Sequence, residues 1–187
     1  MKNGIFVSAL KYAADFDHSA LVAGMARTYA QRGIPVRSEP TLPGGKHADL
    51  AISMGNRWTY IEVKTRSNST SKSMRRISYR QDFLREILRL RAHSLKQLPR
   101  KEASLVVLAT SAAPNRRKAV SKIAIARSFA RRIFDHDSEN VLGLMIFSPF
   151  RSRGPSCSGW KYASTIIANP NWEAGVGGFE KLASVQL

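Results

Sequence analysis

Apolar positions along the chain recur with two different periods, which divide it into helices and strands. Helical spacing, with an apolar residue at every third or fourth position, marks the segments 18–34, 78–98 and 116–134. Short alternating or continuous apolar runs mark strands at 34–40, in the two arms of a hairpin within 48–67, and at 104–110, 140–150 and 160–170. This order predicts an α/β sandwich with a central mixed sheet flanked by helices. The length of 187 residues fits a single domain, 1–187.

The dipeptide Gly55-Asn56 separates the two arms of the hairpin and is one of the favoured pairs for a two-residue turn. Counting outward from this turn places Asp49 directly opposite Glu62, with Cβ atoms about 5 Å apart. Because side chains alternate between the faces of a strand, one face is apolar and belongs against the core. That face collects Leu50, Ile52, Met54, Ile61 and Val63. The other face collects His47, Asp49, Tyr60, Glu62 and Lys64, and the same count places His47 opposite Lys64. A shift of one residue in register would remove the pairing of the acids.

Two carboxylates that face each other across a hairpin are destabilising unless a positive charge lies between them. A divalent cation fits, because such cations are held by one or two carboxylates together with water and substrate phosphates. Lys64 shares the face and can approach a phosphate oxygen or a metal-bound water. Carboxylates, a cation and a lysine at an exposed sheet end are typical of a phosphodiester-cleaving site. The alternative is a solvated outer face on which Asp49, Glu62 and Lys64 form only surface ion pairs.

The positive charge of the chain predicts a polyanionic partner. Thirty Lys and Arg against 13 Asp and Glu give a net charge of +17, and nucleic acid is the first candidate partner for such a surface. A ribosome-associated or membrane-surface protein is the alternative. The chain contains no run of about 18 apolar residues, so no membrane-spanning helix is expected. The N-terminal segment lacks a signal peptide's continuous apolar core, and Cys157 is the one cysteine; both features predict a cytoplasmic location.

The spacing of Asp49 and Glu62-Val63-Lys64, with the second group at the end of a hydrophobic strand, resembles the signature of the PD-(D/E)xK nuclease superfamily. Members share a restriction-endonuclease-like αβββαβ core, and the order predicted for residues 19–110 is similar to it. The resemblance implies that Asp49, Glu62 and Lys64 are catalytic. It also implies that Asp49 and Glu62 hold Mg²⁺ or Mn²⁺, with the Val63 carbonyl oxygen as an additional ligand.

Further positions follow from the same resemblance. Ala48 stands where the motif's name has proline, a residue that members often lack. Many members carry another acid in the first helix or strand; the predicted helix has none, so Glu39 is the candidate metal ligand, with a surface loop glutamate as the alternative. Some members carry a glutamine on the following helix, where Gln81 stands, with a solvated glutamine as the alternative. The segment 38–67 also resembles archaeal Holliday-junction resolvases, which leaves the substrate open.

Basic residues follow the second arm of the hairpin directly and are expected to contact the nucleic-acid backbone. These nucleic-acid-binding candidates are Lys72, Arg75, Arg76 and Arg80. Further basic residues in the helices near 75–101 and 116–132 are expected to contact phosphates in part, the alternative being a solvated face. For Trp58 and Tyr60, packing under a neighbouring helix is favoured over stacking on bases.

Together these features predict a metal-dependent endonuclease that hydrolyses phosphodiester bonds in DNA, of a repair, recombination or restriction type, with RNA as substrate left open. The expected cofactor is Mg²⁺ or Mn²⁺. A homodimer is plausible by analogy with the superfamily, since cutting both strands of a duplex needs two active sites. The alternative is a non-catalytic nucleic-acid-binding or assembly protein that retains the nuclease fold.

Overall fold

The computed structural model describes residues 18–42, 44–54, 56–65, 79–99, 102–110, 112–129, 134, 140–152, 159–170 and 172. The helices are α2 (His18–Gln31), α3 (Tyr79–Leu95) and α4 (Arg116–Ser128). The strands are β1 (Val36–Ser38), β2 (Leu50–Met54), β3 (Arg57–Thr65), β4 (Ser104–Ala109), β5 (Val141–Ser152) and β6 (Gly159–Ala168). In the described part of the chain, no helix is long and apolar enough to span a membrane.

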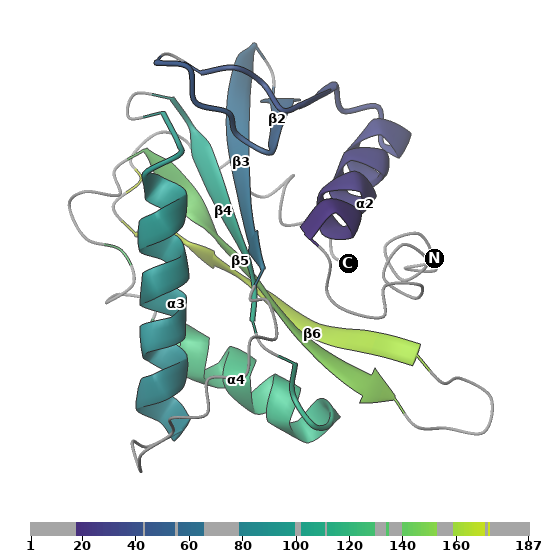
Figure 1. Ribbon diagram of the computed structural model, residues 1–187, viewed down its shortest axis with the longest axis vertical. Coiled ribbons are helices and arrows are strands. Elements are labelled where there is room, and N and C mark those ends of the chain that lie inside the picture. The colour runs from purple at the N-terminus through teal and green to yellow at the C-terminus, as the bar shows by residue number, and fades with distance from the viewer. Residues whose placement is uncertain are drawn as a thin grey trace.

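The six described strands form one mixed sheet in the order β1-β2-β3-β4-β5-β6. Strands β1, β2 and β3 pair antiparallel, β3, β4 and β5 pair parallel, and β6 returns antiparallel to β5. Helix α2 covers one face of the sheet, and α3 and α4 lie against the other face (Figure 1). The predicted α/β sandwich with a central mixed sheet is therefore confirmed, and the elements follow the predicted order.

The hairpin has the predicted register. Every described pair from Met54↔Arg57 at the turn to Leu50↔Ile61 is the pair expected from a two-residue turn. Strand β2 begins at Leu50, so Asp49 stands at the position just before it, next to the end of the ladder. The pattern was predictable because a one-residue slip would have turned every apolar side chain of the hairpin away from the core.

Two apolar clusters fill the space on either side of the sheet. On one side, Leu21, Met25 and Tyr29 of α2 pack against Leu50, Ile52, Ile61 and Val63 of the hairpin. On the other side, α3 and α4 pack against β4 and β5. The alternation along β3 directs Ile61 and Val63 toward α2, and so directs Glu62 and Lys64 toward the α3 side. This second side carries Glu62 and Lys64, whereas Asp49, just before β2, contacts His18 of α2.

Several details differ from the sequence expectations. Helix α4 ends at Ser128, earlier than the predicted boundary at 134, and β5 continues to Ser152. The ladder of the hairpin does not extend to His47, which instead forms an isolated bridge with Thr41, so the expected position of His47 opposite Lys64 is wrong. The predicted position of His47 assumes that the hairpin pairing continues beyond Leu50, where β2 begins.

Candidate active site

Glu62 is the most deeply buried member of the site. Its exposed fraction is 1%, although it is an acid near the end of a strand. Oε1 accepts a hydrogen bond from Lys64 Nζ, while Oε2 is buried without a hydrogen-bond partner in the described part of the chain. Burial is the main cause of a raised pKa for this carboxyl; the Lys64 hydrogen bond opposes the shift and the negative charge of Asp49 adds to it. The expectation of a solvated surface glutamate is therefore wrong for Glu62.

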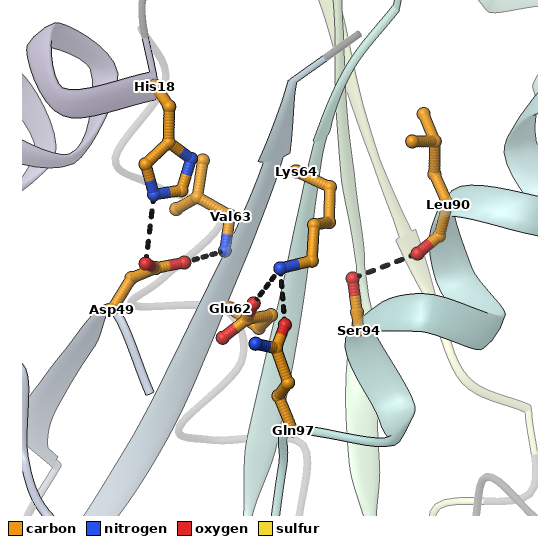
Figure 2. A network of polar contacts seen from close by, with 8 residues as sticks. All are labelled: His18, Asp49, Glu62, Val63, Lys64, Leu90, Ser94 and Gln97. Carbon is orange, nitrogen blue, oxygen red and sulfur yellow. Dashed lines mark hydrogen bonds and ion pairs between the residues drawn. The ribbon is translucent and has the colours of Figure 1, made fainter. Parts of the chain in front are cut away.

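Asp49 connects the sheet to the first helix. Its Oδ2 accepts a hydrogen bond from the backbone N–H of Val63 at 2.7 Å, and its Oδ1 lies 3.0 Å from His18 Nε2 (Figure 2). The side chain is 20% exposed. The backbone pairing of the hairpin ends at Leu50 and Ile61. Just beyond it, the hydrogen bond from the Val63 N–H to Asp49 joins the two arms again, with a carboxylate as acceptor in place of a backbone carbonyl. Asp49 is thereby fixed beside β3, close enough to Glu62 to raise its pKa.

Lys64 joins the hairpin to the end of α3. Its ammonium group donates hydrogen bonds to Glu62 Oε1 and to Gln97 Oε1, and the side chain is 24% exposed (Figure 2). Gln97 follows directly after the last turn of α3, in which Ser94 Oγ donates to the carbonyl of Leu90 at 3.1 Å. The cation is thus held by a buried acid on one side and an amide on the other, with part of its surface open to solvent.

The carboxylates of Asp49 and Glu62 are the candidate ligands of a divalent cation. The described residues contain no group of three or more His, Cys, Asp or Glu side chains placed to share a metal ion. The acidic oxygens of this region are those of Asp49 and Glu62, and Glu62 Oε2 is buried with no partner among the described residues. Mg²⁺ is commonly bound through one or two carboxylates, with water and substrate supplying the rest. The chemistry of the two carboxylates suits such an ion, and the roles of Asp49, Glu62 and the Val63 carbonyl as ligands remain predictions.

Glu39 lies near this site through its backbone. Its N–H donates to the carbonyl of Asp49 at 3.1 Å, and its φ of 48° places it in the left-handed region. Its side chain is exposed. Because no described group of three acids exists, the Glu39 carboxylate does not join Asp49 and Glu62 in a shared metal site in this structure. His47 points to the same turn, with Nδ1 3.5 Å from the Glu39 carbonyl.

Of the four predicted nucleic-acid contacts, Arg80 is the one that the structure describes. Lys72, Arg75 and Arg76 are outside the described residues. Arg80 stands at the start of α3, about 22 Å along the helix axis from its last residue. There its guanidinium lies 4.8 Å from the centre of the Phe129 ring and 3.3 Å from Ser128 Oγ, at the end of α4. Gln81 shares this end of α3, remote from the Lys64 contact at Gln97.

Two residues of the site, His18 and Gln97, were missed by the reasoning from sequence. His18 is the first residue of α2, the helix in which the family resemblance predicts an acid rather than a partner of an acid. Gln97 lies 16 positions after Gln81, the glutamine of the prediction, and beyond the end of α3. The signal that could have found both is the requirement that a buried acid and its lysine have hydrogen-bond partners.

Comparisons with known proteins were made for sequence and for structure. No protein-family model and no curated protein matches this sequence. Among solved structures, the chain is similar to Pyrococcus furiosus SfsA in complex with Ca²⁺, with 12% sequence identity and a TM-score of 0.35. The similarity covers 81% of this chain and 64% of the SfsA chain. The chain therefore spans less than two thirds of the length of that protein.

Proposed function

We propose that this protein is a metal-dependent nuclease of the PD-(D/E)xK type that hydrolyses phosphodiester bonds in DNA. The observation that carries the proposal is the buried carboxylate of Glu62, whose Oε2 has no described hydrogen-bond partner and which lies beside a second acid. Burial of an acid without full pairing is unfavourable, and the charge of Asp49 makes it more so. A divalent cation between the two acids would offset both penalties.

Asp49 and Glu62 would hold the metal ion, Mg²⁺ or Mn²⁺. When bound, such an ion polarises the phosphoryl oxygens and lowers the pKa of water in its coordination sphere. Asp49 would be oriented for this role by His18, since a hydrogen bond to one carboxylate oxygen fixes the direction of the other. His18 is therefore assigned as a positioning residue.

Lys64 would act on the substrate. Its ammonium group is anchored by Glu62 and Gln97 and remains partly exposed, so it can contact a phosphate oxygen and help to position the attacking water. The formal charges of Asp49, Glu62 and Lys64 sum to −1, and one divalent cation would make the site positive. That change would favour the binding of a phosphodiester.

The charge of the whole chain supports a nucleic-acid substrate. A net charge of +17 steers polyanions toward the protein and stabilises their binding by release of counterions. A non-catalytic nucleic-acid-binding protein is the second candidate. It is favoured by the ion pair between Lys64 and Glu62, which partly neutralises the acid without a metal ion.

A cleavage panel separates the two candidates. Linear, nicked, branched and single-stranded DNA, and RNA of the same sequences, would be incubated with the protein in Mg²⁺, in Mn²⁺ and in EDTA. We expect cleavage in one or both metals and none in EDTA. Lys64→Ala should lower the cleavage rate by about 10²-fold or more, as for loss of a general acid–base group, and should leave DNA binding largely intact.

Lys161→Ala is the matched control, because Lys161 is an exposed lysine of β6, three strands away from β3 in the sheet. Its cleavage rate should stay within about two-fold of the wild type, the range expected for a surface substitution. If the wild-type protein binds nucleic acid but cuts no form of it with either metal, the nuclease proposal is wrong and the non-catalytic candidate replaces it.

A further inference from the structure

A pocket of about 450 Å³ opens on the sheet near the hairpin, over β1, β2 and β3. Arg37, Trp58 and Tyr60 are among its lining residues. Arg37 of β1 pairs with Ala51 of β2, and Ala51 pairs with Tyr60 of β3. Arg37, Ala51 and Tyr60 therefore form a row across the sheet. The volume falls in the range of small-molecule sites, which is about 300–1,000 Å³.

The pocket shares a face of β3 with the candidate active site. Trp58, Tyr60, Glu62 and Lys64 are alternate residues of one strand, so their side chains leave it on the same side. At about 3.3 Å per residue, Tyr60 is about 7 Å and Trp58 about 13 Å along the strand from Glu62. The pocket and Glu62 therefore lie on one face of β3, and Lys64, whose side chain is 24% exposed, is the more accessible of the two site residues on that face.

The chemistry of the lining favours a flat, electron-rich group attached to an anion. The guanidinium carbon of Arg37 lies 4.1 Å from the centre of the Trp58 ring, a cation–π arrangement in which the planar cation covers one face of the indole. Tyr60 adds a second ring that is half-buried. Hydroxyl groups of Ser38 and Thr41 complete the polar part of the wall, and the described lining residues include one positive charge and no negative one.

Unpaired nucleobases are the ligands that this combination recognises. Single-stranded nucleic acids bind proteins by stacking bases on aromatic rings or on guanidinium planes while a basic surface follows the backbone. Bases within a duplex are stacked on their neighbours and do not offer their faces to such a pocket. The expected packing of Tyr60 is confirmed, since it lies against the apolar cluster that includes α3, and both Trp58 and Tyr60 also line the pocket.

We propose that the pocket between Arg37, Trp58 and Tyr60 binds an unpaired nucleobase, and that the strand carrying this base runs along β3 toward Glu62 and Lys64. The substrate of the nuclease would then be a single strand or a strand with an unpaired base near the cut. The assignment of a substrate depends on the proposed nuclease function, whereas binding of the base does not.

Binding is measured without metal so that cleavage plays no part. Fluorescence anisotropy in EDTA, at fixed ionic strength, would give the affinity for a labelled thymidine 12-mer, for an abasic 12-mer with the same number of phosphates, and for a 12-base-pair duplex. For the wild type we expect the thymidine strand to bind about 10-fold or more tightly than the abasic strand, since stacking of each base contributes measurably to affinity.

Trp58→Ala should weaken binding of the thymidine strand by roughly 10- to 100-fold and leave binding of the abasic strand within about two-fold. Trp58→Phe keeps an aromatic ring and should retain most of the affinity; it also guards against a folding defect in the alanine variant. Arg57→Ala is the matched control for Arg37→Ala. Arg57 is an exposed arginine of the same hairpin, but alternation along β3 places it on the opposite face.

Arg37→Ala should weaken binding of the thymidine strand more than that of the abasic strand, while Arg57→Ala should affect both equally. Equal loss for both strands in every variant, or no preference for bases in the wild type, would overturn the pocket assignment. That result would leave a metal-dependent cleavage activity standing. Base-dependent binding together with no cleavage in any metal would instead remove the nuclease function and keep the pocket.

Discussion

Replacement of Glu62 by glutamine tests the metal site most directly. The substitution keeps the size of a side chain that is 1% exposed, and it keeps an oxygen that can accept the hydrogen bond from Lys64. It removes the negative charge and puts an amide –NH2 group, which cannot ligate a cation, in the place of the unpartnered Oε2. We therefore expect the variant to fold but to lose the effect of metal on stability.

The size of that effect follows from binding to the folded state alone. At a metal concentration 100 times the dissociation constant, a single site stabilises a protein by about 2.7 kcal/mol. For a chain of 150 to 250 residues, 1 kcal/mol shifts the melting temperature by about 2–4 °C. Wild-type protein should therefore gain about 5–10 °C on saturation with Mn²⁺, whereas Glu62→Gln should gain less than about 1 °C.

The measurement is thermal unfolding followed by circular dichroism in EDTA and in increasing MnCl₂ or MgCl₂, with calorimetry to obtain the dissociation constant. Glu102→Gln is the matched control, because Glu102 is an exposed glutamate outside the site and its substitution should preserve the full metal-induced shift. A Glu62→Gln variant that retains the wild-type shift, or a wild type that shows none at saturating metal, would refute the assignment of Glu62 as a ligand.

Three further predictions concern His18, Gln97 and the protonation of Glu62. His18→Ala removes the side chain 3.0 Å from Asp49 Oδ1 and should weaken Mn²⁺ binding about 10-fold, as measured by calorimetry; unchanged affinity would remove its positioning role. Gln97→Ala removes one of the two acceptors of Lys64 and should slow cleavage about five-fold, the equivalent of roughly 1 kcal/mol, with DNA affinity unaltered; an equal loss of affinity would contradict this. Finally, a raised pKa means that folded Glu62 binds its proton more tightly than the unfolded chain does, so stability without metal should fall as pH rises from about 4.5 toward the raised value and then level off. Urea unfolding from pH 4 to 8 should show this decline in the wild type relative to Glu62→Gln, and parallel profiles would show that Glu62 is not its source.

The register of the hairpin was predictable from a short stretch of sequence because it depends on local rules. A two-residue turn and strict alternation of apolar side chains leave one pairing that buries Leu50, Ile52 and Ile61 together, and this pairing is observed. The opposition of Asp49 and Glu62 follows from it by counting. What local rules do not state is where a strand stops, and the expected position of His47 failed for that reason.

Basic residues illustrate a second limit. Arg91 and Lys122 belong to the two basic helices expected to be solvated or to contact phosphates, yet they are only 7% and 4% exposed. The ammonium group of Lys122 lies 5.5 Å from the centre of the Phe83 ring, between α3 and α4. Long basic side chains can cover apolar surface with their stems, so a count of charges indicates the class of partner without indicating which residues meet it.

Burial of Glu62 reduces the screening of its repulsion with Asp49. On a solvated sheet face, water and salt would screen the repulsion between Asp49 and Glu62, and a nearby lysine would suffice. The helix α3 and the turn at Gln97 lie over this side of the sheet, so the repulsion acts in a less polar medium and one oxygen of Glu62 is left without a partner. Sequence periodicity identifies the face on which an acid lies but not the element that covers the face, because that contact joins residues 33 positions apart. Because Glu62 Oε2 is buried without a partner in the described part of the chain, the ion pair with Lys64 accounts for only one of the two carboxylate oxygens.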